Sequence, residues 1–483
     1  MERAYHRSIR WSFIGSAGLT LLQFLQMLVF ARLAGPAAAG DYALAAAFMG
    51  FLTPLAEAGL SQAVVQAEAV DPRQLATLAW LNLAVAVLAL GVVTWVSPWI
   101  AGWYGRPDLA GLLPLMGLAL LAMPFGASPA GMLVRAFRFA AVARIEMAAA
   151  TAGFLVLAVL AACGWGAWAM ATGFLVRQTA LALANLWAMQ AHTKIDWWRP
   201  ASLRSVGTLV RFGSYDLAAR WADFLANYLD KLIVGKWLGA TALGYYQLAF
   251  SLLVLPTARL GYLFTRVSYP VFARLRGSAL AMEAFFQRTA MDLTGLLYPV
   301  YLGMLLFAGE IIRVLYGPAW LPAVPLLQAF AIAGWVRTLN AVFPPLTKGI
   351  GHPQWLFGWM LLWTLLSNGT LTVFLAFNPT AGTAAWSRVA AKFLLEIPLL
   401  AMLAGRCNVG FGPVIGHAAM RLAWLMPVAV AVGLADWIID DFWCGFALKT
   451  AVFLLCLIGL GWGSPFRSDW QRLMLILAPA ADK

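Results

Sequence analysis

The sequence predicts an all-α polytopic membrane protein with about 14 transmembrane helices, in two pseudo-symmetric six-helix lobes followed by two C-terminal helices. Charged residues make up only 11% of the 483 residues and hydrophobic residues 63%, whereas soluble domains carry about 25% charge. Long windows without charge recur along the chain, and one segment returns at an offset of 204 residues. An outer-membrane barrel is excluded, because its strands would alternate polar and apolar residues.

The individual helices follow from apolar stretches bounded by glycine, proline or charge. A helix needs about 20 apolar residues to cross a bilayer core, and the charge-free windows 74–105, 109–134, 147–176 and 354–387 each hold at least one span. The first helix is expected to be retained, because the apolar run 11–31 is longer than a signal-peptide core. The predicted helices lie near 11–33, 41–64, 75–99, 109–133, 141–163, 166–190, 213–236, 243–268, 289–313, 322–346, 354–377, 381–404, 416–435 and 443–463.

The distribution of cations predicts the orientation. With the N-terminus placed in the cytoplasm, the predicted inside segments hold 21 Lys and Arg residues and the outside segments hold five. Loops on the cytoplasmic side of membrane proteins are enriched in Lys and Arg. We therefore expect both termini in the cytoplasm, and the net charge of +13 needs no nucleic-acid partner to explain it.

Cofactor and catalytic motifs are missing from the sequence. The four cysteines form no CxxC pair, the four histidines have no metal-ligand spacing, and no phosphate-binding loop or nucleophile motif occurs. We expect no cofactor, no metal site and no enzymatic activity.

An internal repeat defines the predicted domains. "ARLAGPAAAGDYALA" (31–45) and "GKWLGATALGYYQLA" (235–249) share six identities, including Gly35 with Gly239, and Thr53 then matches Thr257. Parallel repeats of this kind are typical of carriers that expose a central site alternately to the two sides. The predicted parts are the first lobe at 1–190, a cytoplasmic interfacial linker at 191–212, the second lobe at 213–405, two further helices at 406–463 and a cytoplasmic tail at 464–483.

One predicted helix carries an unusual amount of charge. In "SYDLAARWADFLANYLDK" (214–231) five polar residues are spaced by four or three positions and share one helical face. A charge at mid-bilayer costs about 2.5–3.5 kcal/mol, so this face should meet water, partners or substrate. Mutual pairing of Asp216, Arg220 and Asp223 is the alternative. The polar face comprises Asp216, Arg220, Asp223, Asn227 and Asp230, and the first helix places Gln23 and Gln26 at the matching repeat positions.

Three segments resemble one known family. They are "NYLDKLIVGKWLGATALGYYQLAFSLLVLPTARLGYLFTRVSYPVFARLRG" (227–277), "FARLAGPAAAGDYALA" (30–45) and "KGIGHPQ" (348–354). They are similar to the polysaccharide-transporter family of O-antigen and exopolysaccharide flippases, within the multidrug/oligosaccharidyl-lipid/polysaccharide (MOP) exporter superfamily. His352 departs from the resemblance, because a cation is more frequent at that position.

The resemblance implies a fold and a function. The MOP flippase fold has two six-helix lobes around a central cavity. The family moves undecaprenyl-diphosphate-linked oligosaccharide units to the periplasmic leaflet of the bacterial inner membrane by alternating access, for O-antigen, exopolysaccharide or capsule synthesis. Candidate partners are then the lipid-linked oligosaccharide, membrane lipids, a polysaccharide polymerase, a chain-length regulator, and a proton or sodium gradient.

A diphosphate headgroup requires cations, and Arg offers a planar fork where Lys offers a point charge. Lys392 also has an alternative role as the neutralising partner of Glu396. The candidate substrate-binding cations are Arg177, Arg220, Lys231, Arg259, Arg337, Arg388 and Lys392. The candidate ion-coupling and cavity-lining residues are Asp216, Asp223, Asn227, Asp230, Gln23 and Gln26.

Three other functions compete with this interpretation. A flippase for peptidoglycan lipid precursors would share the fold and the diphosphate chemistry. An ion-coupled exporter of small drugs would need a cavity dominated by acids and typically 12 helices, which the intramembrane cations argue against. A scaffold for a polymerase would not require the charged face.

Overall fold

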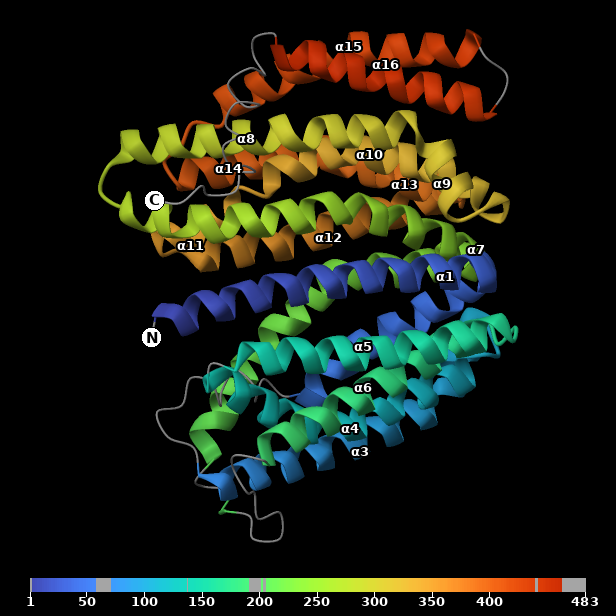
Figure 1. Cartoon of the computed structure of the whole chain (residues 1–483), viewed down its shortest axis with the longest axis vertical. Helices are drawn as coiled ribbons and strands as arrows, with labels where there is room; N and C mark the ends of the chain where they lie inside the picture. Colours follow the sequence, from blue (N-terminus) through green and yellow to red (C-terminus); the bar gives the residue numbers. More distant parts are fainter. Residues whose placement is uncertain are drawn as a thin grey trace. The chain divides into compact units, whose positions relative to one another are not determined.

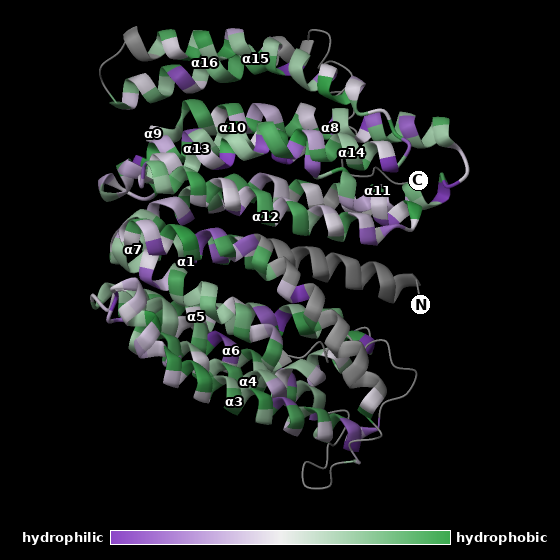
Figure 2. Ribbon diagram, turned by 180° about the vertical axis from the view of Figure 1, so that it is seen from behind, coloured by the Kyte–Doolittle hydropathy of each residue, from purple (hydrophilic) through white to green (hydrophobic). Residues whose placement is uncertain are grey.

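The computed structural model of the chain describes residues 2–57, 71–136, 138–190, 201–202, 206–438 and 442–462. Within these ranges the chain is helical and contains no β-strand. Nine of the described helices are long and apolar enough to cross a membrane, and Figure 2 shows hydrophobic residues along most of their length. The predicted all-α polytopic membrane protein is confirmed, whereas the number of 14 helices and the six-helix lobes stay predictions.

Contacts divide the chain into two compact units, Met1–Gly244 and Tyr245–Lys483, and α7 contributes to both (Figure 1). The described helices of the first unit are α1 (Glu2–Glu57), α3 (Pro72–Tyr104), α4 (Leu109–Arg135), α5 (Phe139–Ala162), α6 (Ala167–Gln190) and the first part of α7 (Gly207–Arg274). In this unit α4 packs against α3 and α6, and α5 packs against α6 and α1.

The second unit contains the rest of α7 and all later helices. Here α10 packs against α8 and α13, α12 packs against α13, and α15 packs against α8 and α16. The predicted lobe boundaries stay a prediction, and most of the predicted linker lies outside the described residues. The helices are α8 (Ala279–Leu306), α9 (Ala308–Leu315), η2 (Pro318–Ala323), α10 (Val324–Asn340), α11 (Phe343–Ile350), α12 (Pro353–Phe377), α13 (Ala381–Ala391), η3 (Lys392–Glu396), α14 (Ile397–Arg406), α15 (Gly412–Ile438) and α16 (Phe442–Trp462).

The predicted helix 289–313 differs from the structure at both ends, because α8 spans Ala279–Leu306 and α9 follows it as a separate helix. Helix α8 already begins at Ala279, where the Ser278 hydroxyl accepts a hydrogen bond from the Ala281 amide at 3.4 Å. Its first turns are amphipathic, with Met282 and Phe286 buried among polar neighbours. A search for uniformly apolar stretches does not detect such turns, because only one side of the helix is apolar.

The internal repeat appears as two matching helix breaks. Gly35 interrupts α1 with φ 75° and ψ 178°, and Gly239 interrupts α7 with φ 81° and ψ 176°. These positions are related by the offset of 204 residues. A backbone with such dihedral angles is essentially restricted to glycine. The repeat therefore encodes the same bend in both helices.

The residues after the two breaks pack against each other reciprocally within the first unit. A Cβ atom added to Gly40 would overlap the carbonyl oxygen of Ala240, and one added to Gly244 would overlap that of Pro36. Gly40 and Gly244 are repeat equivalents, as are Pro36 and Ala240. The two copies therefore cross at backbone distance, which only small residues allow in a membrane helix pair.

Replacing Gly239 with Ala should destabilise the protein by about 1–3 kcal/mol, the cost of holding a side chain in this backbone region. No atom lies within 4 Å of the added Cβ, so the loss would come from the backbone and not from a clash. The measurement is the thermal unfolding midpoint of the purified protein in detergent. Gly91→Ala is the matched control, because its Cβ also meets open space but its backbone is helical. Equal midpoints for the two variants would contradict the prediction.

Candidate functional site

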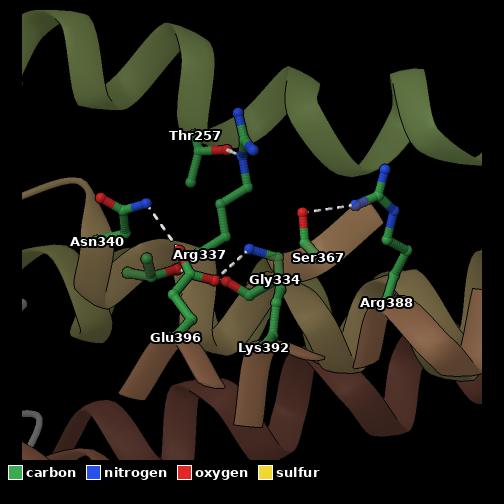
Figure 3. Close-up of polar contacts among 9 residues, drawn as sticks. Thr257, Gly334, Arg337, Asn340, Ser367, Arg388, Lys392 and Glu396 are labelled. Atoms are coloured by element: carbon green, nitrogen blue, oxygen red, sulfur yellow. Dashed lines mark hydrogen bonds and ion pairs between the residues drawn. The ribbon is translucent and has the colours of Figure 1, made fainter. Parts of the chain in front are cut away.

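A cluster of charged and polar side chains lies inside the second unit (Figure 3). It is assembled from helices that are far apart in the sequence: α7, α10, α12, α13 and η3. We call it the basic cluster. Its members are Thr257, Arg337, Asn340, Ser367, Arg388, Lys392 and Glu396, three cations against one carboxylate.

The basic cluster contains a buried ion pair. Lys392 Nζ lies 2.6 Å from Glu396 Oε2, and their side chains are 10% and 0% exposed. Asn340 Nδ2 donates to the other carboxylate oxygen at 2.8 Å, and the Lys392 ammonium lies 5.0 Å from the centre of the Trp363 ring. The alternative role proposed for Lys392, neutralisation of Glu396, is therefore realised in this structure.

The ion pair lies on a π-helical turn, η3, which interrupts the helix formed by α13 and α14. Such turns are rare and often occur at functional sites. Arg388, Lys392 and Glu396 follow one another at intervals of four residues. This spacing places all three on one side of the helix, towards the neighbouring helices α10 and α12.

Arg388 connects three helices through its guanidinium. Its Nη1 and Nη2 donate to Ser367 Oγ at 3.0 Å and to Asn368 Oδ1 at 3.2 Å on α12. Its Nε donates to the hydroxyl of Tyr246 on α7 at 3.2 Å. Each of its three nitrogens thus has a neutral acceptor, and none of these acceptors cancels its charge.

Arg337 on α10 is held differently. Its Nε donates to Thr257 Oγ1 on α7 at 2.9 Å. Within the described residues, no carboxylate lies at ion-pair distance from Arg337, and no acceptor binds its two terminal nitrogens. The side chain is partly exposed. Arg337 is therefore the cation of the basic cluster that has donors available to a further group.

The predicted cations of the first unit form a separate group. Arg177 on α6 lies in the neighbourhood of Glu146 of α5 and of Tyr42 of α1. The Lys231 ammonium donates to the backbone oxygen of Asn227 at 2.7 Å and lies 4.1 Å from the centre of the Tyr228 ring. Arg177 and Lys231 thus belong to the first unit, while Arg337, Arg388 and Lys392 come together in the second.

The predicted charged face of α7 is described only in part. Asp230 is 2% exposed and accepts a hydrogen bond from the Lys231 amide at 2.9 Å, while Arg220 is partly exposed and Asn227 is exposed. The side chains of Asp216, Asp223 and Arg259 lie outside the described part of the structure. Of the matching residues on α1, Gln23 is exposed and Gln26 Nε2 donates to Met170 Sδ at 3.4 Å. The roles assigned to these residues stay predictions.

Sequence reasoning missed several neutral members of the basic cluster. Asn340 and Ser367, and Asn368 beside the cluster, are single polar residues in apolar helices, and no spacing rule connects them to the charged side chains they contact, Glu396 and Arg388. Thr257 could have been singled out from the sequence, because it is the repeat equivalent of Thr53. For metals, the described residues contain no group of three His, Cys, Asp or Glu side chains that could hold an ion.

Chemically, the basic cluster suits an anionic group that enters between apolar helices. Arg337 supplies charge and free donors, and the low dielectric of the surroundings strengthens any hydrogen bond it makes. Glu396 lowers the total charge without reaching Arg337 at ion-pair distance.

The relatives of this chain are proteins named for the biosynthesis of polysaccharides. The family model for polysaccharide biosynthesis proteins matches residues 29–325. The teichuronic acid biosynthesis protein TuaB of Bacillus subtilis (strain 168) is 27% identical over 334 residues, 68% of this chain and 68% of that protein. The succinoglycan biosynthesis transport protein ExoT of Rhizobium meliloti (strain 1021) is 26% identical over 367 residues, 76% of this chain and 73% of that protein.

Solved structures share the fold at low sequence identity. The lipid II flippase MurJ in an inward closed conformation matches with a TM-score of 0.76 and 14% identity, over 96% of this chain and 99% of that chain. An inward-facing multidrug resistance MATE family transporter of the MOP superfamily matches with a TM-score of 0.65 and 15% identity, over 81% and 94%. These two likenesses concern the fold alone.

Proposed function

Because this chain belongs to the polysaccharide biosynthesis protein family, we propose that it is a flippase for undecaprenyl-diphosphate-linked oligosaccharide. The resemblance found in the sequence is confirmed by the family match. In the proposed function the protein lies in the bacterial inner membrane with both termini in the cytoplasm. It acts as a carrier and catalyses no covalent step.

The observation that carries the proposal is the basic cluster inside an apolar helical unit. A charge placed among membrane helices is unfavourable unless it meets a partner, water or substrate. Arg337 has donors that no described residue accepts, and a phosphate oxygen is the acceptor that arginine binds best. The named relatives include a succinoglycan biosynthesis transport protein and a lipopolysaccharide biosynthesis protein, which supports a polysaccharide precursor as the cargo.

Movement of the headgroup requires a shielded path, because an unpaired polar group in hydrocarbon costs several kcal/mol, of order 4–8 for an amide or hydroxyl. We propose alternating access, in which the diphosphate and glycan enter from the cytoplasmic side and leave on the other side while the prenyl chain stays in lipid. A proton or sodium gradient would drive the cycle. The cycle would deliver its product to a polysaccharide polymerase and a chain-length regulator.

A peptidoglycan-precursor flippase is the second candidate. It would use the same fold, which matches that of the lipid II flippase with a TM-score of 0.76 over 96% of the chain, and the same diphosphate chemistry. The 27% identity to the teichuronic acid protein favours the polysaccharide cargo, since the lipid II flippase is only 14% identical.

Deletion of the coding sequence should trap lipid-linked oligosaccharide in the cytoplasmic leaflet. The measurement is its accessibility to a membrane-impermeant label in spheroplasts, with the complemented strain as control. A deletion strain that still exposes the glycan normally, and has no second flippase, would contradict the proposal. Accumulation of the peptidoglycan precursor instead would assign the second candidate.

A further inference from the structure

We propose that Thr257 and Tyr301 are positioning residues for Arg337, and that they direct its terminal nitrogens to a phosphate of the substrate headgroup. This inference rests on the proposed function. It assigns roles to two uncharged side chains of the second unit that touch no ion pair.

A directed chain of hydrogen bonds holds the guanidinium. Tyr301 has one hydroxyl proton and donates it to the backbone oxygen of Leu253 at 3.0 Å. Thr257 Oγ1 lies 3.2 Å from Tyr301 Oη and 3.2 Å from the Val254 oxygen, so the Thr257 proton can go to either acceptor. In both cases a lone pair of Thr257 Oγ1 is left to accept from Arg337 Nε at 2.9 Å.

Both positioning residues are buried. Thr257 is 6% exposed and Tyr301 is 0% exposed. A long arginine side chain loses conformational freedom when it binds a ligand, and this loss weakens binding. A hydrogen bond that already fixes Nε reduces the loss, because the fork is oriented before the ligand arrives.

The other two cations of the basic cluster are less suited than Arg337 to bind the headgroup, because their donors are already occupied. Arg388 donates to Tyr246, Ser367 and Asn368 through all three of its nitrogens. Lys392 is bound to Glu396 at 2.6 Å. The ligand class that suits the remaining donors is a phosphate or diphosphate group, since two parallel N–H donors match two of its oxygens.

The internal repeat supplies a matched control. Thr53 is the equivalent of Thr257, 204 residues earlier, and lies 18 residues after its helix break as Thr257 does. Its hydroxyl donates to the Met49 oxygen at 2.7 Å, a bond inside its own helix. Thr53→Val therefore removes the same hydroxyl in the same setting without touching Arg337.

The test measures binding of undecaprenyl diphosphate, without sugar, to the purified full-length protein in nanodiscs. Thr257→Val should weaken binding about tenfold, the scale of one hydrogen bond to a charged group. Tyr301→Phe should weaken it less, Thr257→Ser should restore it, and Thr53→Val should leave it unchanged. In an Arg337→Gln background, Thr257→Val should cause no further loss, because its effect passes through Arg337.

The outcomes separate this inference from the proposed function. Equal losses in Thr257→Val and Thr257→Ser, or additive losses in the double variant, would overturn the positioning role. Each variant is first compared with wild type for monodispersity and thermal midpoint, and Tyr301→Phe provides an independent variant if Thr257→Val does not fold. A wild-type protein that moves no lipid-linked oligosaccharide in proteoliposomes would instead overturn the proposed function.

Discussion

Replacing Glu396 with Gln should lower the free energy of unfolding by about 3–5 kcal/mol, the cost of removing one partner from a buried ion pair. Glu396 is 0% exposed and Lys392 is 8% exposed, so water cannot replace the lost carboxylate. Gln can keep the oxygen that accepts from Asn340, but its amide NH2 group then replaces the oxygen that accepts from Lys392, so the change removes that acceptor together with the charge. The expected result is a large fall of the thermal unfolding midpoint in detergent.

The control is the double variant Lys392→Met/Glu396→Gln, which removes both charges and keeps the shape of the pair. It should unfold at a higher temperature than Glu396→Gln alone, because no uncompensated ammonium is left in the interior. A double variant less stable than Glu396→Gln would show that Lys392 does not depend on Glu396 for its burial.

The sequence offered the Lys392–Glu396 ion pair as one of two roles for Lys392, and it gave no sign of the surroundings of the pair. Arg388, Lys392 and Glu396 are spaced by four residues in the sequence, and in the structure all three contact residues of α10 or α12. The spacing could not reveal that Asn340 completes the carboxylate, because this contact joins residues 56 positions apart. It also could not reveal the π-helical turn, which has no established residue signature.

Much of the fold followed from hydropathy and the repeat. Apolar stretches predicted the membrane helices, and the offset of 204 residues predicted that Gly35 and Gly239 are equivalent. The structure adds that both positions bend a helix in the same way, and that Gly40 and Gly244 allow the two copies to cross. Close backbone approach between distant segments depends on three-dimensional packing, so a single sequence shows the glycines without their partners.

The cations show the same limit. The sequence identifies all of them as intramembrane charges. Only the contacts between helices show that Arg388 has three hydrogen-bonded nitrogens and Arg337 has one. This difference decides which residue can meet a ligand.

Replacing Arg337 with Gln should reduce the initial rate of lipid-linked oligosaccharide transport about 10- to 100-fold. The range corresponds to loss of a charged hydrogen-bond donor, about 1.5–3 kcal/mol. The transport rate of Arg337→Lys should lie between the rates of Arg337→Gln and the wild type, because Lys keeps the charge but loses the planar fork. The measurement is the rate in proteoliposomes at equal amounts of folded protein.

Arg313→Gln is the matched control for this prediction. It removes the same charge from an exposed residue whose guanidinium lies 4.5 Å from the Phe442 ring and takes no part in the basic cluster. It should transport at the wild-type rate. If both variants lost transport to the same extent, the effect of Arg337 would be one of net charge only. A selective loss in Arg337→Gln, with an unchanged thermal midpoint, would instead mean that the available donors of Arg337 are used during transport, since neither overall charge nor stability could then account for it.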